Sequence, residues 1–331
     1  MKLSMESNNK IKFTLIVGTV ILTVLTIFSF FVGRYPLTLS GIISGDSRQW
    51  QVFVTLRASR GIVGCIGGFV LGVAGFVFQT VFRNPLASPD IIGVSSGASA
   101  GAAFGILFLS GSMAVTASAF AGALGSVVLA LMLASLTTGQ DGRGIVLAGI
   151  AVHSLAQTAL IFLKLLADPE KQLASIEYWI MGSLNGISRD SLAIPFFTTL
   201  AGFIVIALLY RQVLILSTSE EEAVSLGVNV TSLRFIILML ATLIVSSIIC
   251  VTGLISFIGL IAPHIARLLT KRNDIFTYIT SGFTGAILLT LADILARSVS
   301  PSELPVSIFT SLLGAPLLII LLIRANKKEA L

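Results

Sequence analysis

Charged residues are scarce in this 331-residue sequence: Lys, Arg, Asp and Glu together make up 11% of it. Soluble domains carry about 25% charged residues. Hydrophobic residues reach 55%, and the mean hydropathy is +1.01. A soluble domain of this size would have too few polar residues to cover its surface. The composition therefore excludes an ordinary soluble enzyme and a disordered chain, and it predicts a polytopic membrane protein in a lipid bilayer.

Cysteine and histidine are also rare, with two of each. Cys65 and Cys250 lie inside apolar runs without a CxxC or Cys/His spacing, and His153 and His264 stand apart, so neither a metal site nor a disulfide is predicted. No G-x-x-x-x-G-K-[ST] loop occurs, so we expect no nucleotide or other cofactor on this chain. The net charge of +6 is spread along the flanks of apolar runs. This pattern indicates membrane orientation rather than nucleic-acid binding.

Long charge-free runs locate the expected spans, because a bilayer-crossing helix needs about 20 mostly apolar residues. About ten transmembrane helices are predicted, at 13–33, 61–82, two within 91–140, 144–163, 191–210, 235–252, 254–266, 275–292 and 304–323. The segment 254–266, after a break at Gly253, is too short for a full span, so we expect a half-span inside the bundle. The predicted fold is an all-α polytopic membrane protein, with one transmembrane domain over 1–331.

Positive charges predict the orientation of the chain. If both termini are cytoplasmic, 13 of the 21 Lys and Arg residues lie in cytoplasmic segments and eight lie outside. The positive-inside rule favours this orientation. It makes 1–12 and 324–331 cytoplasmic tails and places a polar loop, 216–232, in the cytoplasm. Four of the outer positive charges crowd into residues 34–60, against the trend.

The polar loop has the features of a short capped helix. Ser219 and Glu222 match a capping box, and the three acids at 220–222 suit the positive end of a helix dipole. Gly227 suits a left-handed helix end and Asn229 the start of another helix, so we expect two short helices around Gly227. They form either a docking element for a soluble cytoplasmic partner or an amphipathic connector on the headgroups. The three acids disfavour contact with an anionic leaflet.

Three arginines are expected on the outer side. Arg57 and Arg60 precede one span, and Arg297 follows another with Glu303 nearby. They bind either lipid headgroups or an acidic extracellular partner. Asp293 stands four residues before Arg297, a spacing that favours a helical ion pair. The centres of the spans hold almost no ionisable residues, which argues against an ion-coupled secondary transporter.

Two other patterns have weaker functional readings. Gly93 to Gly97 matches G-x-S-x-G, but a hydrolase nucleophile at Ser95 or Ser96 needs a strand before it, and an apolar run follows instead. Glycines at four-residue spacing predict close helix packing. These are Gly64, Gly68 and Gly72 in one span and Gly97, Gly101 and Gly105 in the next.

Five longer segments together resemble the permease subunit of ABC importers for iron-siderophores, haem and cobalamin. They are FRNPLASPDIIGVSSGA at 82–98, GLISFIGLIAPHIAR at 253–267, ADILAR at 292–297, ELPV at 303–306 and LGAP at 313–316. The resemblance covers roughly residues 50–325. It implies a multi-pass protein of the bacterial inner or plasma membrane that is not itself an enzyme.

The resemblance assigns roles to residues and partners. An extracytoplasmic substrate-binding protein would dock on Arg57, Arg60 and Arg297, although Ala58-Ser59 replaces the usual Leu-Pro between the first two. ABC ATPase subunits would contact the loop, at Glu220, Glu221, Glu222, Ala223, Leu226 and Gly227. Asn84 and Leu86 match residues that close the cytoplasmic end of the pathway, whereas a second gate position near Gly142-Arg143 departs from the family pattern.

The family would act as a dimer of permeases, and the sequence leaves open whether the partner is a second copy or a paralogue. Among substrates, an iron-siderophore is the leading hypothesis, with cobalamin or haem as the alternative. No residue in the sequence selects between them.

Overall fold

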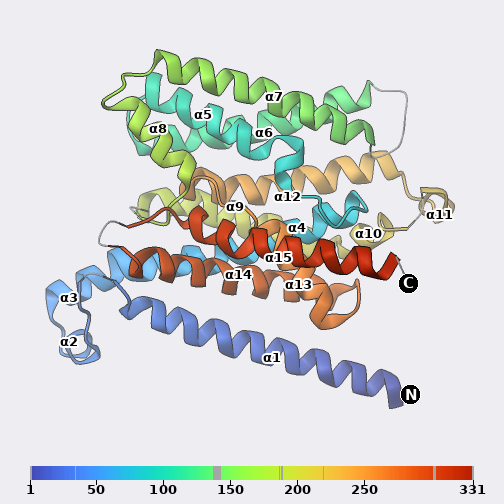
Figure 1. Cartoon of the computed structure of the whole chain (residues 1–331), viewed down its shortest axis with the longest axis horizontal. Coiled ribbons are helices and arrows are strands. Elements are labelled where there is room, and N and C mark those ends of the chain that lie inside the picture. The colour runs from blue at the N-terminus through green and yellow to red at the C-terminus, as the bar shows by residue number, and fades with distance from the viewer. Residues whose placement is uncertain are drawn as a thin grey trace. The chain divides into compact units, whose positions relative to one another are not determined.

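The computed structural model describes residues 2–33, 35–136, 143–185, 187, 189–218, 220–300 and 303–329. Within these ranges the chain is helical and contains no strand, which confirms the predicted all-α class (Figure 1). The first half holds α1 (Lys2–Phe31), α2 (Leu39–Ile43), α3 (Ser47–Val52), η1 (Phe53–Ala58), α4 (Ser59–Val81), η2 (Pro89–Ile92), α5 (Val94–Phe108), α6 (Ser112–Ser135) and α7 (Arg143–Leu166). The second half holds α8 (Gln172–Met181), α9 (Arg189–Leu208), α10 (Tyr210–Ile215), α11 (Glu220–Ser225), α12 (Val230–Thr252), α13 (Ile258–Thr270), α14 (Ile275–Ser298) and α15 (Val306–Glu329).

The helices match the predicted spans closely. Six segments in the described residues are long and apolar enough to cross a membrane, and they lie in α1, α3 to α4, α6, α7, α12 and α14. Four shorter apolar helices lie in α5, α9, α13 and α15. Together they account for the approximate number of ten.

The break before the half-span lies where the sequence predicts it. Helix α12 ends at Thr252, and Gly253 follows with φ 70° and ψ −166°, a conformation that favours glycine. A side chain at Gly253 would also collide with the backbone of Trp179. The 13-residue α13 then begins at Ile258, so it is too short to cross a bilayer alone.

The chain forms two compact units. Unit 1 comprises Met1–Val73, Ser183–Gly186 and Ile255–Leu331, and unit 2 comprises Ala74–Gly182 and Ile187–Leu254. Unit 1 therefore joins the two ends of the chain, and the middle of the chain forms unit 2.

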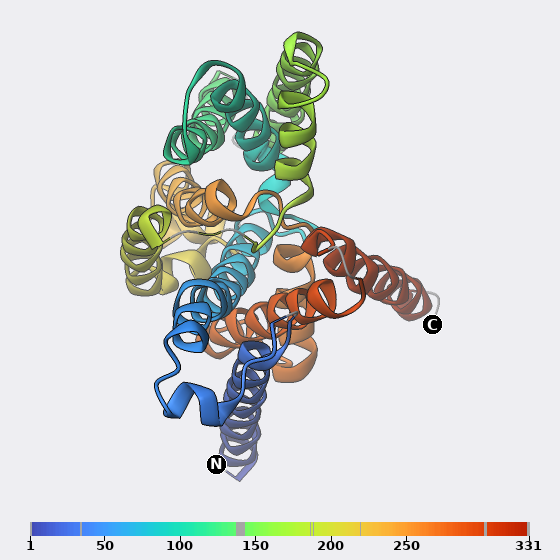
Figure 2. The ribbon, with the colours of Figure 1, turned by 90° about the vertical axis from the view of Figure 1, so that its left-hand side faces the viewer.

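Unit 1 packs α14 against α1, α13, α15 and the first part of α4. Gly68 and Gly72 of α4 meet the backbone of α14 at Gly285 and Ser281, where any side chain would collide. This confirms the predicted close packing of these glycines. Figure 2 views the unit from the end that carries α2 and α3. The amino end of α1 and the carboxyl end of α15 both lie at the opposite end of the unit (Figure 1).

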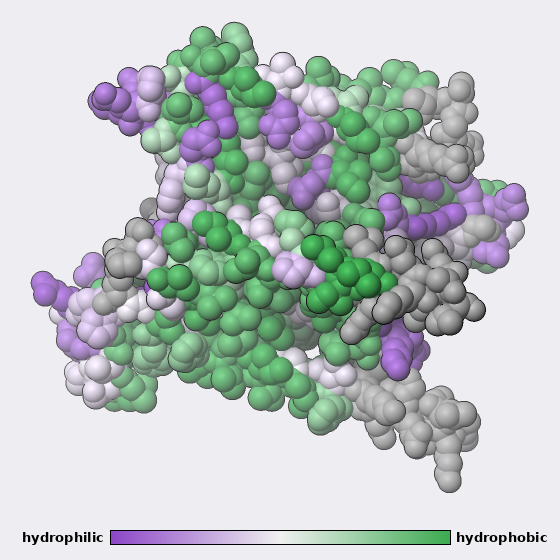
Figure 3. Space-filling model, viewed as in Figure 1, coloured by the Kyte–Doolittle hydropathy of each residue, from purple (hydrophilic) through white to green (hydrophobic). Residues whose placement is uncertain are grey.

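The surface of unit 1 suits a lipid environment. Large apolar side chains on α1 are exposed, among them Phe13, Val20 and Val24. On the face drawn in Figure 3, hydrophobic colour covers α14 and α15, and hydrophilic colour gathers at the α2 and α3 end. Such a band fits the hydrocarbon core, with the polar end in the interfacial region.

Unit 2 packs α5, α6, α7 and α12 around small residues. Gly97, Gly101 and Gly105 of α5 approach the backbone or serines of α6 too closely for any side chain. Ala102, Ala119 and Cys250 form a buried cluster that joins α5, α6 and α12. Helices α8 and α11 lie at opposite ends of this unit (Figure 1).

Two helical features differ from the predicted layout. The predicted span starts at residue 61, whereas the helical segment begins at Ser47 and runs through α3 and the π-helical η1 into α4. The prediction placed Arg57 and Arg60 before the span, but both are buried inside unit 1, and the helix continues through them. Helix α8 was not predicted, because its 10 residues include charged and polar side chains and are too few for a span.

Candidate functional site

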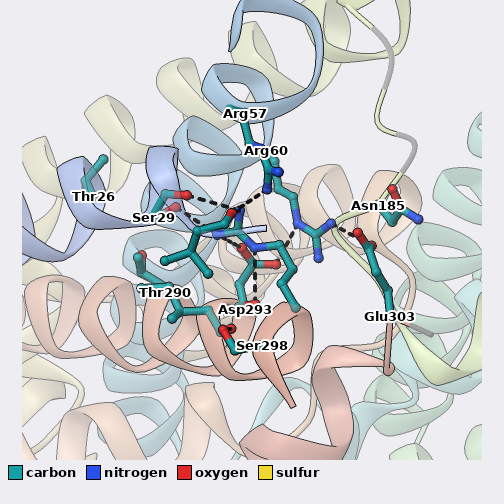
Figure 4. A network of polar contacts seen from close by, with 12 residues as sticks. Thr26, Ser29, Arg57, Arg60, Asn185, Thr290, Asp293, Ser298 and Glu303 are labelled. Carbon is teal, nitrogen blue, oxygen red and sulfur yellow. Dashed lines mark hydrogen bonds and ion pairs between the residues drawn. The ribbon is translucent and has the colours of Figure 1, made fainter. Parts of the chain in front are cut away.

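The three arginines predicted for the outer side lie together in unit 1, in a polar cluster that we name the arginine network: Arg57, Arg60, Asp293, Arg297 and Glu303. Arg57 comes from η1, Arg60 from α4, and Asp293 and Arg297 from the end of α14, while Glu303 precedes α15. Figure 4 shows Arg57, Arg60, Asp293 and Glu303 converging near Ser29, at the end of α1. The three arginines are buried, with exposed fractions of 8%, 6% and 5%.

Arg60 bridges two acids from distant parts of the chain. Its Nε donates to Asp293 Oδ1 at 2.8 Å, and its Nη1 donates to Glu303 Oε2 at 2.8 Å. Its Nη2 is buried and has no hydrogen-bond partner among the described residues. Asp293 is almost fully buried, while Glu303 is partly exposed. The network therefore reaches the surface at Glu303.

Arg297 links the same aspartate to the end of α1. Its Nη2 donates to Asp293 Oδ2 at 2.9 Å, which confirms the predicted i,i+4 pair. Its Nη1 donates to the backbone carbonyls of Ser29 and Val32, at 3.1 Å each. The last carbonyls of a helix lack partners inside the helix and carry partial negative charge. Arg297 therefore caps α1 as well as neutralising Asp293.

Arg57 also contacts the end of α1 but has no acidic partner in the described residues. It donates to the carbonyl of Val32 and, at 3.5 Å, to that of Tyr35. A side chain at Gly33 would collide with the Arg57 guanidinium. The absence of a side chain at this position is therefore what admits Arg57 to the network.

The network has an excess of one positive charge, since three arginines face two carboxylates. Ion pairs in a low-dielectric interior are strong only when the remaining donors and acceptors are also satisfied. Here the carbonyls at the end of α1 supply the additional acceptors. A second set of polar contacts joins α1, α4 and α14. Thr26 contacts Cys65 at 3.0 Å, and Cys65 contacts Thr290 at 3.7 Å.

The segment of α2 and α3 beside the network is ordered by its own polar contacts. Thr38 donates to the Gln49 side chain, and that side chain donates to Asp46. Asp46 also caps α3 by accepting from the backbone N–H groups of Arg48 and Gln49. The Gln49 side chain, followed by these N–H groups, lowers the pKa of Asp46 below its usual value.

The family resemblance implies that a binding protein reaches the three arginines directly, while the residues alone leave headgroup contact as the alternative. In unit 1 their guanidinium groups are instead buried and largely occupied, so their structural role is to join α1, α4 and α14. Sequence reasoning found the Asp293 and Arg297 pair but missed both acids as partners of Arg60. The excess of outer positive charge was the available signal, and a docking role for the arginines stays a prediction.

The predicted coupling segment, residues 216–232, lies in unit 2. Helix α11 ends in a Schellman motif: the Gly227 N–H donates to Val224 O at 2.9 Å and the Val228 N–H to Ala223 O at 3.2 Å. Gly227 has φ 76°, as its predicted left-handed role requires. Asn229 then caps α12 by accepting from the Ser232 N–H at 3.1 Å. The second expected short helix is thus the first turn of the span α12. The capping-box residue Ser219 lies outside the described residues.

The surface of α11 combines acids with exposed apolar side chains. Glu220, Glu221 and Glu222 occupy its first turn, where the helix dipole favours negative charge. Ala223 is fully buried and fixes the helix to the unit. Val224 and Leu226 are 59% and 64% exposed. This polar end of unit 2 therefore presents an apolar knob on an acidic helix.

The predicted gate segment, residues 84–87, follows α4 after Phe82 and Arg83 and lies in unit 2. The Arg83 N–H donates to Thr80 O at 3.2 Å and the Asn84 N–H to Gln79 O at 3.1 Å, which is another Schellman motif. The side-chain oxygen of Asn84 accepts from the Leu86 N–H at 2.9 Å. The backbone carbonyl of Asn84 accepts from the Ala87 N–H at 3.0 Å. These bonds fix a tight turn on which Asn84 and Leu86 are exposed.

A side-chain hydrogen bond joins the segment after α4 to the segment before α11: Arg83 Nε donates to the carbonyl of Leu216 at 3.1 Å. Sequence reasoning missed this contact, which spans 133 residues. The second predicted gate position is Gly142-Arg143. Gly142 lies outside the described residues, and only the backbone of Arg143 is described, at the start of α7.

The other candidate chemistries lack a site in the described residues. Ser95 donates to Asp90, and Ser96 donates to the Gly93 carbonyl at the start of α5, without a preceding strand. No group of three or more His, Cys, Asp and Glu residues is placed to hold a metal ion in the described ranges.

Known proteins resemble this chain in sequence over nearly its whole length. Residues 21–324 match the FecCD transport family. The chain is 30% identical to the hemin transport system permease protein of Yersinia pestis and 32% identical to an Fe(3+)-citrate import system permease protein of Bacillus subtilis. These alignments cover 98% and 99% of this chain and 99% and 100% of the relatives.

A solved structure has the same fold. It is described as an inward-facing conformation of a metal-chelate type ABC transporter, and it is 31% identical to this chain. The TM-score is 0.84, and the match covers 94% of this chain and 99% of that one.

Proposed function

Because the chain belongs to the FecCD transport family, a family of membrane permeases and not of enzymes, we propose that it is the transmembrane subunit of an ABC importer that brings an iron-siderophore into the cytoplasm. The observation that carries this proposal is the family match over 21–324, which includes every described span except the first nine residues of the span in α1. Similarity to permeases for hemin and Fe(3+)-citrate supports a metal chelate as the substrate class. Haem or cobalamin is the alternative cargo.

Separate ATPase subunits drive this importer through the coupling segment. Support comes from the exposed Val224 and Leu226 on the acidic α11, since an exposed apolar knob at a polar end suits a cleft on a partner. Closure of two ATPase subunits on ATP then moves α11 as a rigid body and changes which end of the pathway is open. A second permease, identical or paralogous, forms the other half of the pathway.

A binding protein delivers the chelate at the outer end, beside α2 and α3. The arginine network supports this by its excess positive charge, and Glu303 brings it to the surface. Arginine holds carboxylates through a planar fork and stays charged at any relevant pH. We propose that the network attracts acidic residues of the binding protein, in competition with lipid headgroups for the same end.

The decisive experiment is uptake into proteoliposomes that contain this chain, the ATPase subunits and a binding protein loaded with radioactive iron-siderophore. Uptake should require ATP, stop with vanadate and persist in the presence of an ionophore. Haem and cobalamin serve as competing cargoes. Uptake without the ATPase subunits, or its collapse with the ionophore, would identify an ion-coupled secondary transporter instead.

The same vesicles test the docking site. Arg57→Met removes an arginine that lacks an acidic partner, so it should raise the binding-protein concentration needed for half-maximal uptake, most strongly at low salt. Arg48→Met, at an exposed arginine of α3, is the matched control. An equal effect of both variants would assign the arginines to headgroup contact.

A further inference from the structure

Arg83 occupies a backbone position that suits glycine better. It has φ 49°, and in the described chain the other non-glycine residues with positive φ are Phe257 and Lys271. The two Schellman bonds at the end of α4 place Arg83 at the residue just beyond the helix, where glycine is the usual choice because a Cβ is unfavourable there. A glycine would end α4 equally well. The arginine side chain therefore serves something other than ending the helix.

That side chain reaches the beginning of the coupling segment. Arg83 Nε donates to the carbonyl of Leu216, just after α10, at 3.1 Å, and both residues belong to unit 2. The preceding carbonyls of Leu214 and Ile215 accept from Ser217 and Thr218. A charged donor at the carboxyl end of a helix complements its partial negative charge. The Leu216 side chain is fully buried, so the acceptor sits on a fixed part of the unit.

Both sides of this bond continue into hydrogen-bonded turns. On one side, the Asn84 turn continues from Arg83 to Leu86 through two hydrogen bonds. On the other, the turn formed by Ser217 and Thr218 separates Leu216 from α11, which begins at Glu220. A displacement of α11 therefore reaches the Arg83 side chain within a few residues, without passing through the length of a spanning helix.

We propose that Arg83 is a positioning residue that transmits movement of α11 to the gate at Asn84 and Leu86. The inference rests on the proposed function, because it requires α11 to move with the ATPase and Asn84 and Leu86 to close the pathway. The alternative is a purely structural cap, in which the bond to Leu216 stabilises unit 2 and carries no motion.

Two neutral substitutions separate the donor from everything else about the residue. In Arg83→Gln the side-chain Nε2 stands the same number of bonds from Cα as Nε does in arginine, so the donor to Leu216 is kept. In Arg83→Met a methyl group occupies that place, so the donor is lost. Both variants keep a Cβ in the left-handed conformation and both remove the charge, so they form a matched pair.

The measurement is the amount of iron-siderophore imported per ATP hydrolysed by the full importer in proteoliposomes. Arg83→Met should hydrolyse ATP with import per ATP reduced about tenfold, the equilibrium factor that corresponds to losing one hydrogen bond of ordinary net strength. Arg83→Gln should stay within about twofold of the unchanged protein, because its donor is retained. The thermal unfolding midpoint of each complex is recorded alongside, and the lost bond should make it lower in Arg83→Met than in Arg83→Gln by no more than about 2–4 °C.

Four other results would overturn the inference. Normal import per ATP in Arg83→Met would show that the bond carries no motion, and equal losses in both variants would assign the effect to the guanidinium charge. A larger drop of the unfolding midpoint in Arg83→Met alone, with import per ATP restored at low temperature, would leave a structural cap. Import by the unchanged protein without ATP hydrolysis would overturn the proposed function and this inference together.

Discussion

Asp293 holds two buried arginines at once, through Arg60 at 2.8 Å and Arg297 at 2.9 Å. Its own side chain is almost completely buried, so no water replaces it if it is lost. Removing one partner of a buried pair leaves an uncompensated charge, which costs more than the pair contributes. Stability at the α2 and α3 end of unit 1 therefore depends on this one carboxylate more than on the number of ion pairs.

Asp293→Asn should consequently destabilise the protein by about 3–5 kcal/mol, because it leaves two buried guanidinium groups without their shared carboxylate. The midpoint of thermal unfolding in detergent micelles measures the effect. Glu303→Gln is the matched control, since its partly exposed side chain pairs with Arg60 alone and should cost about 1 kcal/mol or less. Equal shifts in the two variants would contradict the special position of Asp293.

At the scale of the element, α11 is a six-residue helix that depends on its two ends. It is too short to be stable by itself, so its capping and packing decide whether it forms. Ala223 packs it into unit 2, and Gly227 ends it in the left-handed conformation. A Cβ at Gly227 would meet nothing within 4 Å, so any penalty there comes from the backbone alone.

Gly227→Val should impair coupling, because a β-branched residue in the left-handed region costs at least about 1–2 kcal/mol and disturbs the end of α11. ATP hydrolysis stimulated by the loaded binding protein should fall together with import. Gly227→Asn supplies the control, since asparagine tolerates this conformation and the site has room. A valine variant that assembles with the ATPase subunits and imports normally would rule out this role for the turn.

The elements that sequence reasoning located correctly have local signals. The break at Gly253, the helix end at Gly227 and the cap at Asn229 are each set by one residue and its immediate neighbours. The missed features are non-local. Arg60 and Glu303 are 243 residues apart and Arg83 and Leu216 are 133 apart, so no pattern within either segment indicates the bond. The same reason explains why the predicted span began at residue 61 and left out η1. Arg57 and Arg60 interrupt an apolar run, and the acids of the arginine network lie far along the chain.

At the scale of the whole molecule, the open question is which side of the membrane each end occupies. Within unit 1 the start of α1 and the end of α15 lie at the same end, which an even number of crossings requires (Figure 1). Thirteen of the 21 basic residues lie on the side predicted to be cytoplasmic. Both termini are therefore predicted to be in the cytoplasm.

Reporter fusions test this orientation directly. With a reporter that is active only in the cytoplasm, a fusion after Leu331 should give a signal. The same reporter inserted near Asp168, in the turn before α8, should give none, because this turn is predicted to be on the outer side. The same two positions fused to a reporter of the opposite specificity provide the control. Equal signals from both positions would show that the assumed number of crossings between them is wrong.

The discontinuity of unit 1 has a consequence for synthesis. Arg57 and Arg60 leave the ribosome with the first quarter of the chain, whereas Asp293 follows Arg60 by 233 residues, after all of unit 2. At about 5–20 residues per second, the two arginines wait roughly 10–50 s for their acids. During that interval they need water or headgroups at the membrane boundary, because a lone buried charge is costly. Arg57 and Arg60 are therefore surface residues of the nascent chain and become buried only in the finished protein.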